Sequence, residues 1–101
     1  MNVQFKKGAL ELCVLALMNK KDRYGYEIIE VISREFEVAE GTIYPLLKRL
    51  QLDGHCESYL QESSGGPPRK YYRITPPGRQ HVKQMIKDWS EFTKAVDNII
   101  T

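Results

Sequence analysis

Gly41 to Gly54, with the sequence GTIYPLLKRLQLDG, is the stretch that decides the fold. Its apolar residues recur at the i, i+3, i+4, i+7 spacing of a helix that packs one face on a core. They are Ile43, Leu46, Leu47 and Leu50. Because a proline ring clashes with the carbonyl four residues before it, Pro45 predicts that the helix begins within about a residue of Thr42. Gly54 can adopt the left-handed conformation that closes a helix, so it predicts the end.

The opposite face of this predicted helix carries polar and cationic groups. Tyr44, Pro45 and Lys48 project away from the apolar stripe, and Thr42 and Arg49 flank them. A hydroxyl, a phenol and two cations are groups that contact the phosphate oxygens and base edges of nucleic acids. The face therefore predicts a nucleic-acid contact, with an ordinary amphipathic surface helix as the alternative.

Two further helices are predicted before this one. The first runs from about Phe5 to Met18, where strong helix formers separate apolar residues at helical spacing: Leu10, Cys13, Val14 and Leu17. After a polar turn over residues 19–23, the second helix opens at Tyr24 with an inward stripe of Ile28, Ile29, Ile32 and Phe36. Residues 37–40 link it to the helix near Thr42. This arrangement predicts a helix-turn-helix, in which the first helix holds the second outward.

After the third helix the period of the apolar residues changes from about 3.6 to about 2, which predicts two antiparallel strands near residues 56–60 and 71–74. The segment between them, residues 61–69, is rich in glycine and proline and is predicted to be neither helix nor strand. It would form an exposed hairpin tip that ends in Arg69 and Lys70. Such a cationic hairpin predicts the wing of a winged helix; a flexible loop with incidental charges is the alternative.

A long final helix is predicted to follow Thr75. The threonine side chain can cap the free amides of the first turn, and prolines such as Pro76 and Pro77 are best tolerated there. Apolar residues then recur at spacings of 3 and 4, the seam along which helices pair: Val82, Met85, Trp89, Phe92, Val96 and Ile99. Little of the chain remains to cover this seam. We therefore expect a homodimer formed mainly through this helix, with part of the stripe packed on the first helix.

Together these elements predict a mainly α fold with a small β-hairpin. Residues 1–75 would form a winged helix-turn-helix DNA-binding domain, and residues 76–101 a C-terminal dimerisation helix. A length of 101 residues, 42% of them hydrophobic and 28% charged, suits one compact domain. No stretch approaches the roughly 18 apolar residues of a membrane span, and no secretion signal opens the chain. We therefore expect a cytoplasmic protein with no membrane partner.

The charge is unevenly distributed although the net charge is only +2. Residues 41–79 contain six Lys or Arg against three Asp or Glu, whereas residues 1–40 contain six against seven and residues 80–101 three against three. A cationic patch on a nearly neutral protein favours a specific contact with a polyanion over general adhesion. Double-stranded DNA is therefore the expected partner of the middle segment.

The sequence offers little for catalysis or for binding a cofactor. Cys13 and Cys56 lie in hydrophobic runs without a Cys-x-x-Cys spacing and are expected to be core thiols. His55 and Cys56, with His81 far along the chain, are the only pairing of a nucleophile with a base, and no carboxylate lies at motif spacing. We expect no enzyme activity, no cofactor and no metal site; a metal or redox site at His55 and Cys56 is the alternative.

The chain resembles PadR-type transcriptional regulators in three groups of residues: Gly25-Tyr26-Glu27-Ile28, the Gly41 to Gly54 stretch, and Gly65-Gly66-Pro67-Pro68-Arg69-Lys70-Tyr71-Tyr72-Arg73-Ile74-Thr75 followed by Gly78-Arg79. The resemblance extends from about Leu10 to the C-terminus, and the single last helix is similar to that of the small subclass. It implies a winged-helix homodimer that represses transcription by binding a palindromic operator. Recognition-helix positions match Thr42, Tyr44, Pro45 and Lys48, and wing positions match Arg69, Lys70 and Tyr71. Two departures are Cys56, where a larger aliphatic residue is usual, and the outward, apolar Leu52.

The resemblance also implies a pocket for a small effector. Some members of the small subclass are similar to sensors of multiple drugs or phenolic compounds, which places the pocket between Trp89 and the first helix. Two indoles across a symmetric dimer could sandwich a flat aromatic molecule; the alternative is a tryptophan that only fills the interface. The residues expected to bind an effector or to form the dimer interface are Leu10, Val14, Met85, Trp89, Phe92 and Val96. For the function as a whole, the alternative is a winged helix that binds protein in place of DNA.

Overall fold

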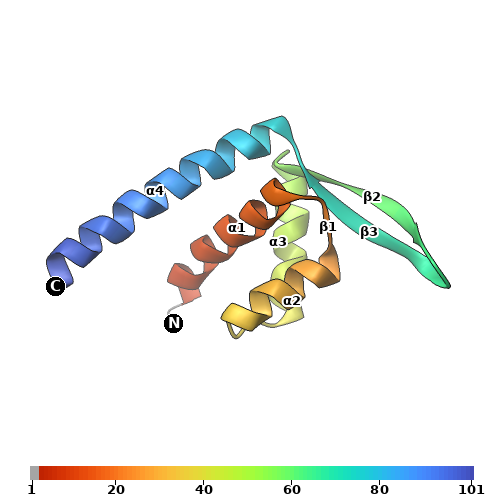
Figure 1. Cartoon of the computed structure of the whole chain (residues 1–101), viewed down its shortest axis with the longest axis horizontal. Coiled ribbons are helices and arrows are strands. Elements are labelled where there is room, and N and C mark those ends of the chain that lie inside the picture. Colours follow the sequence, from red (N-terminus) through yellow and green to blue (C-terminus); the bar gives the residue numbers. More distant parts are fainter. Residues whose placement is uncertain (1–2) are drawn as a thin grey trace.

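The computed structural model describes residues 3–101, with side chains from Gly8 onward. Within this range, helices and strands follow one another along the chain (Figure 1): α1 (Val3–Lys20), β1 (Arg23–Tyr24), α2 (Gly25–Glu35), α3 (Glu40–Leu52), β2 (Cys56–Ser63), β3 (Gly66–Ile74) and α4 (Pro76–Ile100). This order confirms the predicted class, a mainly α winged helix-turn-helix with a β-hairpin and a long last helix. The wing and α4 project from the body in different directions, and the molecule is 53 Å long.

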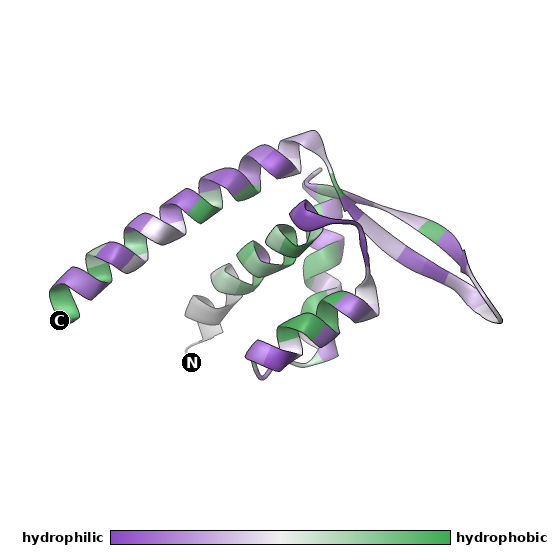
Figure 2. Cartoon of the chain, viewed as in Figure 1, coloured by the Kyte–Doolittle hydropathy of each residue, from purple (hydrophilic) through white to green (hydrophobic). Residues whose placement is uncertain are grey.

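α1 lies at the centre of the hydrophobic core. It extends two residues further at each end than the predicted Phe5 to Met18, and it packs against α2, β3 and α4. Every residue from Ala9 to Met18 except Glu11 is apolar, so apolar residues occur on nearly every side, which is typical of a buried helix. In Figure 2 the green, hydrophobic segments of α2 and α3 lie beside those of α1. The buried core consists of Leu10, Val14, Leu15, Met18, Ile28, Ile29, Ile32, Ile43, Leu47, Leu50, Cys56, Tyr72, Ile74 and Val82.

α2 and α3 form the expected helix-turn-helix, but α3 begins at Glu40, two residues earlier than Pro45 suggested. The proline removes only the bond to the carbonyl of Gly41, which is exposed and can be hydrated. The N–H of Thr42 closes a tight first turn on the Ala39 carbonyl at 3.0 Å. Pro45 therefore allows α3 to begin about half a turn before Thr42.

The sheet has three antiparallel strands in the order β1-β3-β2, not only the two of the predicted hairpin. β1 falls in the segment that was predicted to be a polar turn and the start of a helix. It pairs Arg23 with Tyr72 and Tyr24 with Tyr71. Two residues are too few to show an alternating pattern, so this strand exists only because β3 passes beside it. It joins the wing to the start of α2.

The wing is longer and more regular than predicted. β2 and β3 remain paired as far as Ser63 and Gly66, so most of the segment 61–69 is strand, and the prediction that it is neither helix nor strand is wrong. The turn itself contains Gly65, which has a φ of 76°. Glycine adopts such a positive φ without strain.

A bulge accommodates the two prolines of the wing. Pro67 and Pro68 lie opposite the single residue Glu62, where the register of the two strands shifts. Proline cannot donate a ladder hydrogen bond and is confined to open edges and bulges. Because β1 reaches only Tyr71 and Tyr72, β3 has an open edge at the prolines. The bulge and the open edge explain why a segment rich in glycine and proline forms a strand and not the predicted loop.

α4 starts at Pro76 with the predicted cap. The hydroxyl of Thr75 accepts a hydrogen bond from the Gly78 N–H at 3.1 Å and donates one to the Gly54 carbonyl at 2.6 Å. Val82, one turn further on, is buried in the core, whereas the later turns extend away from the body (Figure 1). The division into segments 1–75 and 76–101 stays a prediction, and the first turns of α4 pack as part of the winged domain.

The glycine at position 78 is required by a close approach. A Cβ there would overlap the carbonyl oxygen of His55 and lie 2.8 Å from Cγ1 of Ile74. Gly78→Ala is therefore expected to lower the free energy of unfolding by about 1–3 kcal/mol, the usual cost of overpacking. Urea unfolding at one fixed protein concentration, followed by circular dichroism, measures the change.

Gly41→Ala is the matched control. A Cβ at Gly41 meets no described atom within 4 Å, and alanine in a helix is favoured over glycine by up to about 1 kcal/mol. The control is expected to be neutral or stabilising. Equal effects of the two substitutions would contradict the tight contact between α4 and the turn at His55.

Candidate nucleic-acid interface

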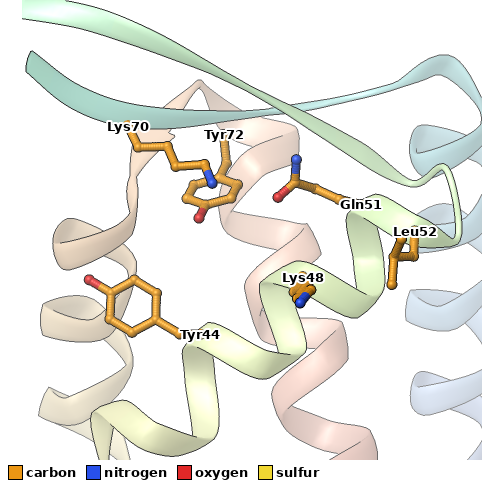
Figure 3. Close-up of a pocket in the computed structure, with 6 residues that line it drawn as sticks. All are labelled: Tyr44, Lys48, Gln51, Leu52, Lys70 and Tyr72. Atoms are coloured by element: carbon orange, nitrogen blue, oxygen red, sulfur yellow. The ribbon is translucent and has the colours of Figure 1, made fainter.

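A groove of about 680 Å³ separates α3 from the wing (Figure 3). It is lined by Tyr44, Lys48, Gln51, Leu52, Lys70 and Tyr72. Lys70 and Tyr72 come from β3, and the other residues come from α3. Two of the lining side chains are cationic and none is acidic. The groove is therefore suited to a polyanion.

Gly25, at the start of α2, fixes the place of Tyr44 in this groove. A Cβ on Gly25 would lie 3.1 Å from Cε1 of Tyr44 and 3.4 Å from Cε2 of Tyr72, so only glycine lets both rings come this close. Burial raises the pKa of Tyr72, and the neighbouring Tyr44 and Cys56 raise it further. Tyr72 is therefore a neutral phenol. The contact of both tyrosines with one glycine sets the position of α3 relative to the wing.

The two lysines of the groove carry unneutralised charge. Within the described residues, neither Lys48 nor Lys70 forms an ion pair. The Nζ of Lys70 lies 5.8 Å from the centroid of the Tyr72 ring, and Lys48 is exposed on α3. One cation thus stands on each side of the groove.

Some of the residues predicted on α3 lie on the far side of the helix. A second hollow, of about 220 Å³, is lined by Leu10, Thr42, Pro45, Leu46 and Arg49. Nη2 of Arg49 lies 3.3 Å from Oε2 of Glu11 on α1, so part of its charge is compensated. All five predicted α3 residues are exposed, but the structure brings only Tyr44 and Lys48 into the groove with the wing.

The three predicted wing residues lie on two different faces of the wing, because side chains alternate along a strand. Lys70 lines the groove, whereas Arg69 and Tyr71 lie on the other face of the wing. The guanidinium carbon of Arg69 is 4.9 Å from the centroid of the Tyr24 ring. The ring of Tyr71 is 5.7 Å from those of Tyr24 and Tyr59. That second face is a cluster of aromatic rings and guanidinium groups.

Sequence reasoning missed Gln51 and Tyr72 as groove residues. Nε2 of Gln51 donates to Oγ of Ser58 at 2.9 Å and so ties α3 to β2. The alternating strand pattern already placed Tyr72 on the opposite face from Tyr71, and this alternation could have identified Tyr72 as a groove residue. Leu52, noted as apolar on the outward face, has 78% of its surface exposed at the edge of the groove.

The apolar face of α4 is only partly covered by α1. A hollow of about 310 Å³ between the two helices is lined by Gly8, Leu12, Met85, Asp88, Trp89 and Phe92. The rings of Trp89 and Phe92 stack with centroids 6.3 Å apart, and 40% of the Trp89 surface is exposed. Beyond them the exposed seam continues through Val96 to Ile99, which is 84% exposed.

Leu10 and Val14, which were predicted to bind an effector or to form the dimer interface, do not line this hollow. Both are buried in the core, and Leu12 and Gly8 of the same helix take their place beside α4. Because α1 is apolar on nearly every side, spacing alone did not reveal which of its sides faces α4.

The comparison with known proteins agrees with this architecture. Residues 14–84, which include α2, α3 and the wing, match the family described as the transcriptional regulator PadR-like family. The chain belongs to this family.

Relatives of this PadR-like chain extend over nearly its whole length. The transcriptional regulator Rv3488 of Mycobacterium tuberculosis is 31% identical over 94 residues, which cover 92% of this chain and 87% of the relative. The crystal structure of a PadR-like transcriptional regulator from Bacillus cereus is 37% identical, covers 97% of both chains and has a TM-score of 0.89. A transcriptional regulator from Streptococcus is 34% identical, with a TM-score of 0.90, and covers 99% of this chain and 100% of its own.

The PadR-like chain is, as a member of this family, a transcriptional regulator and not an enzyme. Cys56 is buried as predicted; burial first, and then the Glu57 carboxylate, raise the pKa of its thiol to about 11. Such a thiol stays protonated and is a poor nucleophile. Cys13 is only partly buried, unlike the predicted core thiol, and burial raises its pKa as well.

None of the helices in the described part of the chain combines the length and the apolar character that crossing a membrane requires.

Proposed function

We propose that this PadR-like regulator binds a palindromic DNA operator as a homodimer and represses transcription. The observation that carries the proposal is the acid-free groove between α3 and the wing, with Lys48 on one side and Lys70 on the other. A duplex backbone is the polyanion that fits a protruding helix flanked by a cationic hairpin. The rival, a winged helix that binds protein, does not require two unpaired lysines at this place.

α3 would act as the recognition helix. Its 13 residues span about 20 Å, enough to cross a major groove about 12 Å wide. Tyr44 and Lys48 would contact the backbone and the groove edge, while Lys70 of the wing would reach a flanking phosphate. Thr42, Pro45 and Arg49 would follow on the far edge of α3, and Arg69 and Tyr71 would act from the outer face of the wing.

The exposed seam of α4 supports the homodimer. A helix of 25 residues is about 37 Å long, and α1 covers only its first part. Trp89, Phe92, Val96 and Ile99 leave a contiguous apolar strip in the monomer. Large exposed apolar patches of this kind are typical of protein interfaces. A second copy, with an identical strip, would bury it along a two-fold axis.

The dimer is expected to hold its two recognition helices about one helical turn, or roughly 34 Å, apart. Genomic fragments selected by the purified protein should therefore contain two inverted half-sites at that separation. Gel shifts on operators whose half-site spacing is changed by half a turn test the geometry, and affinity should fall sharply. Undiminished affinity in the gel shifts would contradict simultaneous binding of two half-sites by the dimer. Failure to select any genomic fragment at low salt would favour the protein-binding alternative.

Lys48→Ala is expected to weaken operator binding and to reduce the slope of log affinity against log salt by about 1 per half-site, because one phosphate contact per subunit is lost. Fluorescence anisotropy at several salt concentrations measures the slope. Arg49→Ala should have a smaller effect, since Arg49 already pairs with Glu11.

Lys94→Ala on α4 is the control and should leave the slope unchanged. If the Lys48 and Lys94 substitutions behave alike, Lys48 is not a phosphate contact.

We further propose that a small flat aromatic effector binds beside Trp89 and releases the operator. The hollow between α1 and α4 lies at the proposed dimer seam, and its Trp89 and Phe92 rings offer flat apolar surfaces. The effector would act by binding the DNA-incompetent arrangement of the two subunits more tightly than the competent one.

Trp89→Ala is expected to reduce the affinity for planar cationic or phenolic dyes at least about tenfold, the loss of roughly 1.4 kcal/mol of ring contact. Because the chain has one tryptophan, the dye's own fluorescence must report binding in the variant. Ile99→Ala, on the same helix but outside the hollow, is the control. Sedimentation must show that both variants keep the state of wild type, and equal dye affinity in all three proteins would exclude the indole from the site.

A further inference from the structure

Three side chains that can bind a metal ion meet where α1, α4 and the turn between α3 and β2 come together. They are Glu11, His55 and His81, which lie far apart in the sequence. One ligating atom from each lies within 4.8 Å of the other two. This cluster is separate from the groove, since none of the three residues lines it.

The geometry of the cluster is defined by its carboxylate. Oε1 of Glu11 lies 3.6 Å from Nε2 of His81, while Oε2 lies 3.3 Å from Nη2 of Arg49. The two oxygens of one carboxylate thus serve two different partners. Arg49 holds the carboxylate in orientation, and Oε1 remains directed toward the histidines. Such outer hydrogen-bonding partners typically orient the carboxylates that bind metals.

His55 contributes a nitrogen that finds no hydrogen-bond partner in the part of the chain that the structure describes. This nitrogen, Nδ1, is buried. An unsatisfied buried polar atom costs about 1–3 kcal/mol, so its presence calls for an explanation. The backbone of His55 is held firmly, since its N–H bonds to the Leu50 carbonyl at 2.9 Å and its carbonyl accepts the Thr75 N–H at 3.1 Å.

The two imidazole rings of the cluster are stacked on each other. Their centroids are 4.1 Å apart and their planes differ by 7°. A metal ion lies in the plane of each imidazole that binds it, so two parallel rings cannot share one ion. Binding of one ion by both rings would require the side chain of His81, which is 37% exposed, to turn so that one nitrogen of each ring and Oε1 of Glu11 face a common point.

We propose that Glu11, His55 and His81 bind one divalent transition-metal ion. Two neutral imidazoles and one carboxylate are the ligands of zinc-type sites that keep an open position for water, and imidazole nitrogen selects such metals over calcium and magnesium. The thiol of Cys56, next to His55 in sequence, does not lie in this group of ligand atoms. The ion would satisfy Nδ1 of His55 and would tie α1 and α4 to the end of α3.

Tag-free, full-length protein titrated with Co²⁺ or Zn²⁺ tests the site without DNA. Wild type is expected to bind one ion per chain and to gain thermal stability, since a ligand that binds only the folded state stabilises it. His81→Ala and Glu11→Gln should each weaken metal binding by at least about tenfold. Substituting a residue that only hydrogen-bonds to a metal ligand already has an effect of this size, so loss of a ligand should cost no less. Gln80→Ala on the same helix and Cys13→Ser are the controls and should bind as wild type does.

The two histidines give a second, independent readout. Because the chain contains no others, the imidazole nitrogen resonances of a Zn²⁺ titration belong to His55 and His81 alone. Both should shift together at one equivalent of metal in folded protein. Absence of binding by folded wild type at millimolar Co²⁺ would overturn the proposal. Unchanged metal affinity in Glu11→Gln would also overturn it. A third contradicting result would be loss of metal binding in Cys13→Ser while the signals of both histidines do not shift when Zn²⁺ is added to wild type.

Discussion

Burial of α1 is the constraint on which the rest of this structure depends. Every residue from Ala9 to Met18 except Glu11 is apolar, so the helix is stable only when other elements pack against it, and α2, β3 and α4 all contact it. Val14 and Leu15 at its centre have no exposed surface. The arrangement of the helix-turn-helix, the sheet and the last helix follows from how each covers part of this one helix. The positions of the groups that contact DNA in the proposed complex are therefore fixed by apolar packing some distance behind them.

The relation between α3 and the wing has a second, more local origin. β1 adds two residues to the edge of β3 at the point where Tyr72 turns toward the helices. Tyr72 and Tyr44 then share the space left by the missing side chain of Gly25. One glycine, one short strand and two rings thus set the width of the groove. Lys48 and Lys70 face it from α3 and the wing, which the hydrogen bond from Gln51 to Ser58 joins, so they present a preformed cationic surface.

α4 is anchored at one end and uncovered at the other. Thr75, Gly78 and Val82 bind its first turns to the domain, whereas the strip from Trp89 to Ile99 is exposed. The cluster of Glu11, His55 and His81 lies at the anchored end. Any ligand of that cluster would act on the junction between α3 and α4, while an aromatic ligand would act on the free part of α4. The two proposed ligands would thus influence the same helix from different places.

The sequence by itself determined the elements whose signals are local. Helical spacing, the Thr75 cap and the change to an alternating period identified the four helices and the hairpin, and resemblance in three short motifs indicated the family. Each of these signals depends on residues close together in the chain. Only the tertiary structure decided which residues meet. The prolines of the wing entered a strand because β1 leaves that edge open, and Leu10 and Val14 were buried because they lie on the side of α1 that faces the core. Sides of a helix and contacts between distant segments are set by packing, which no short stretch of sequence contains.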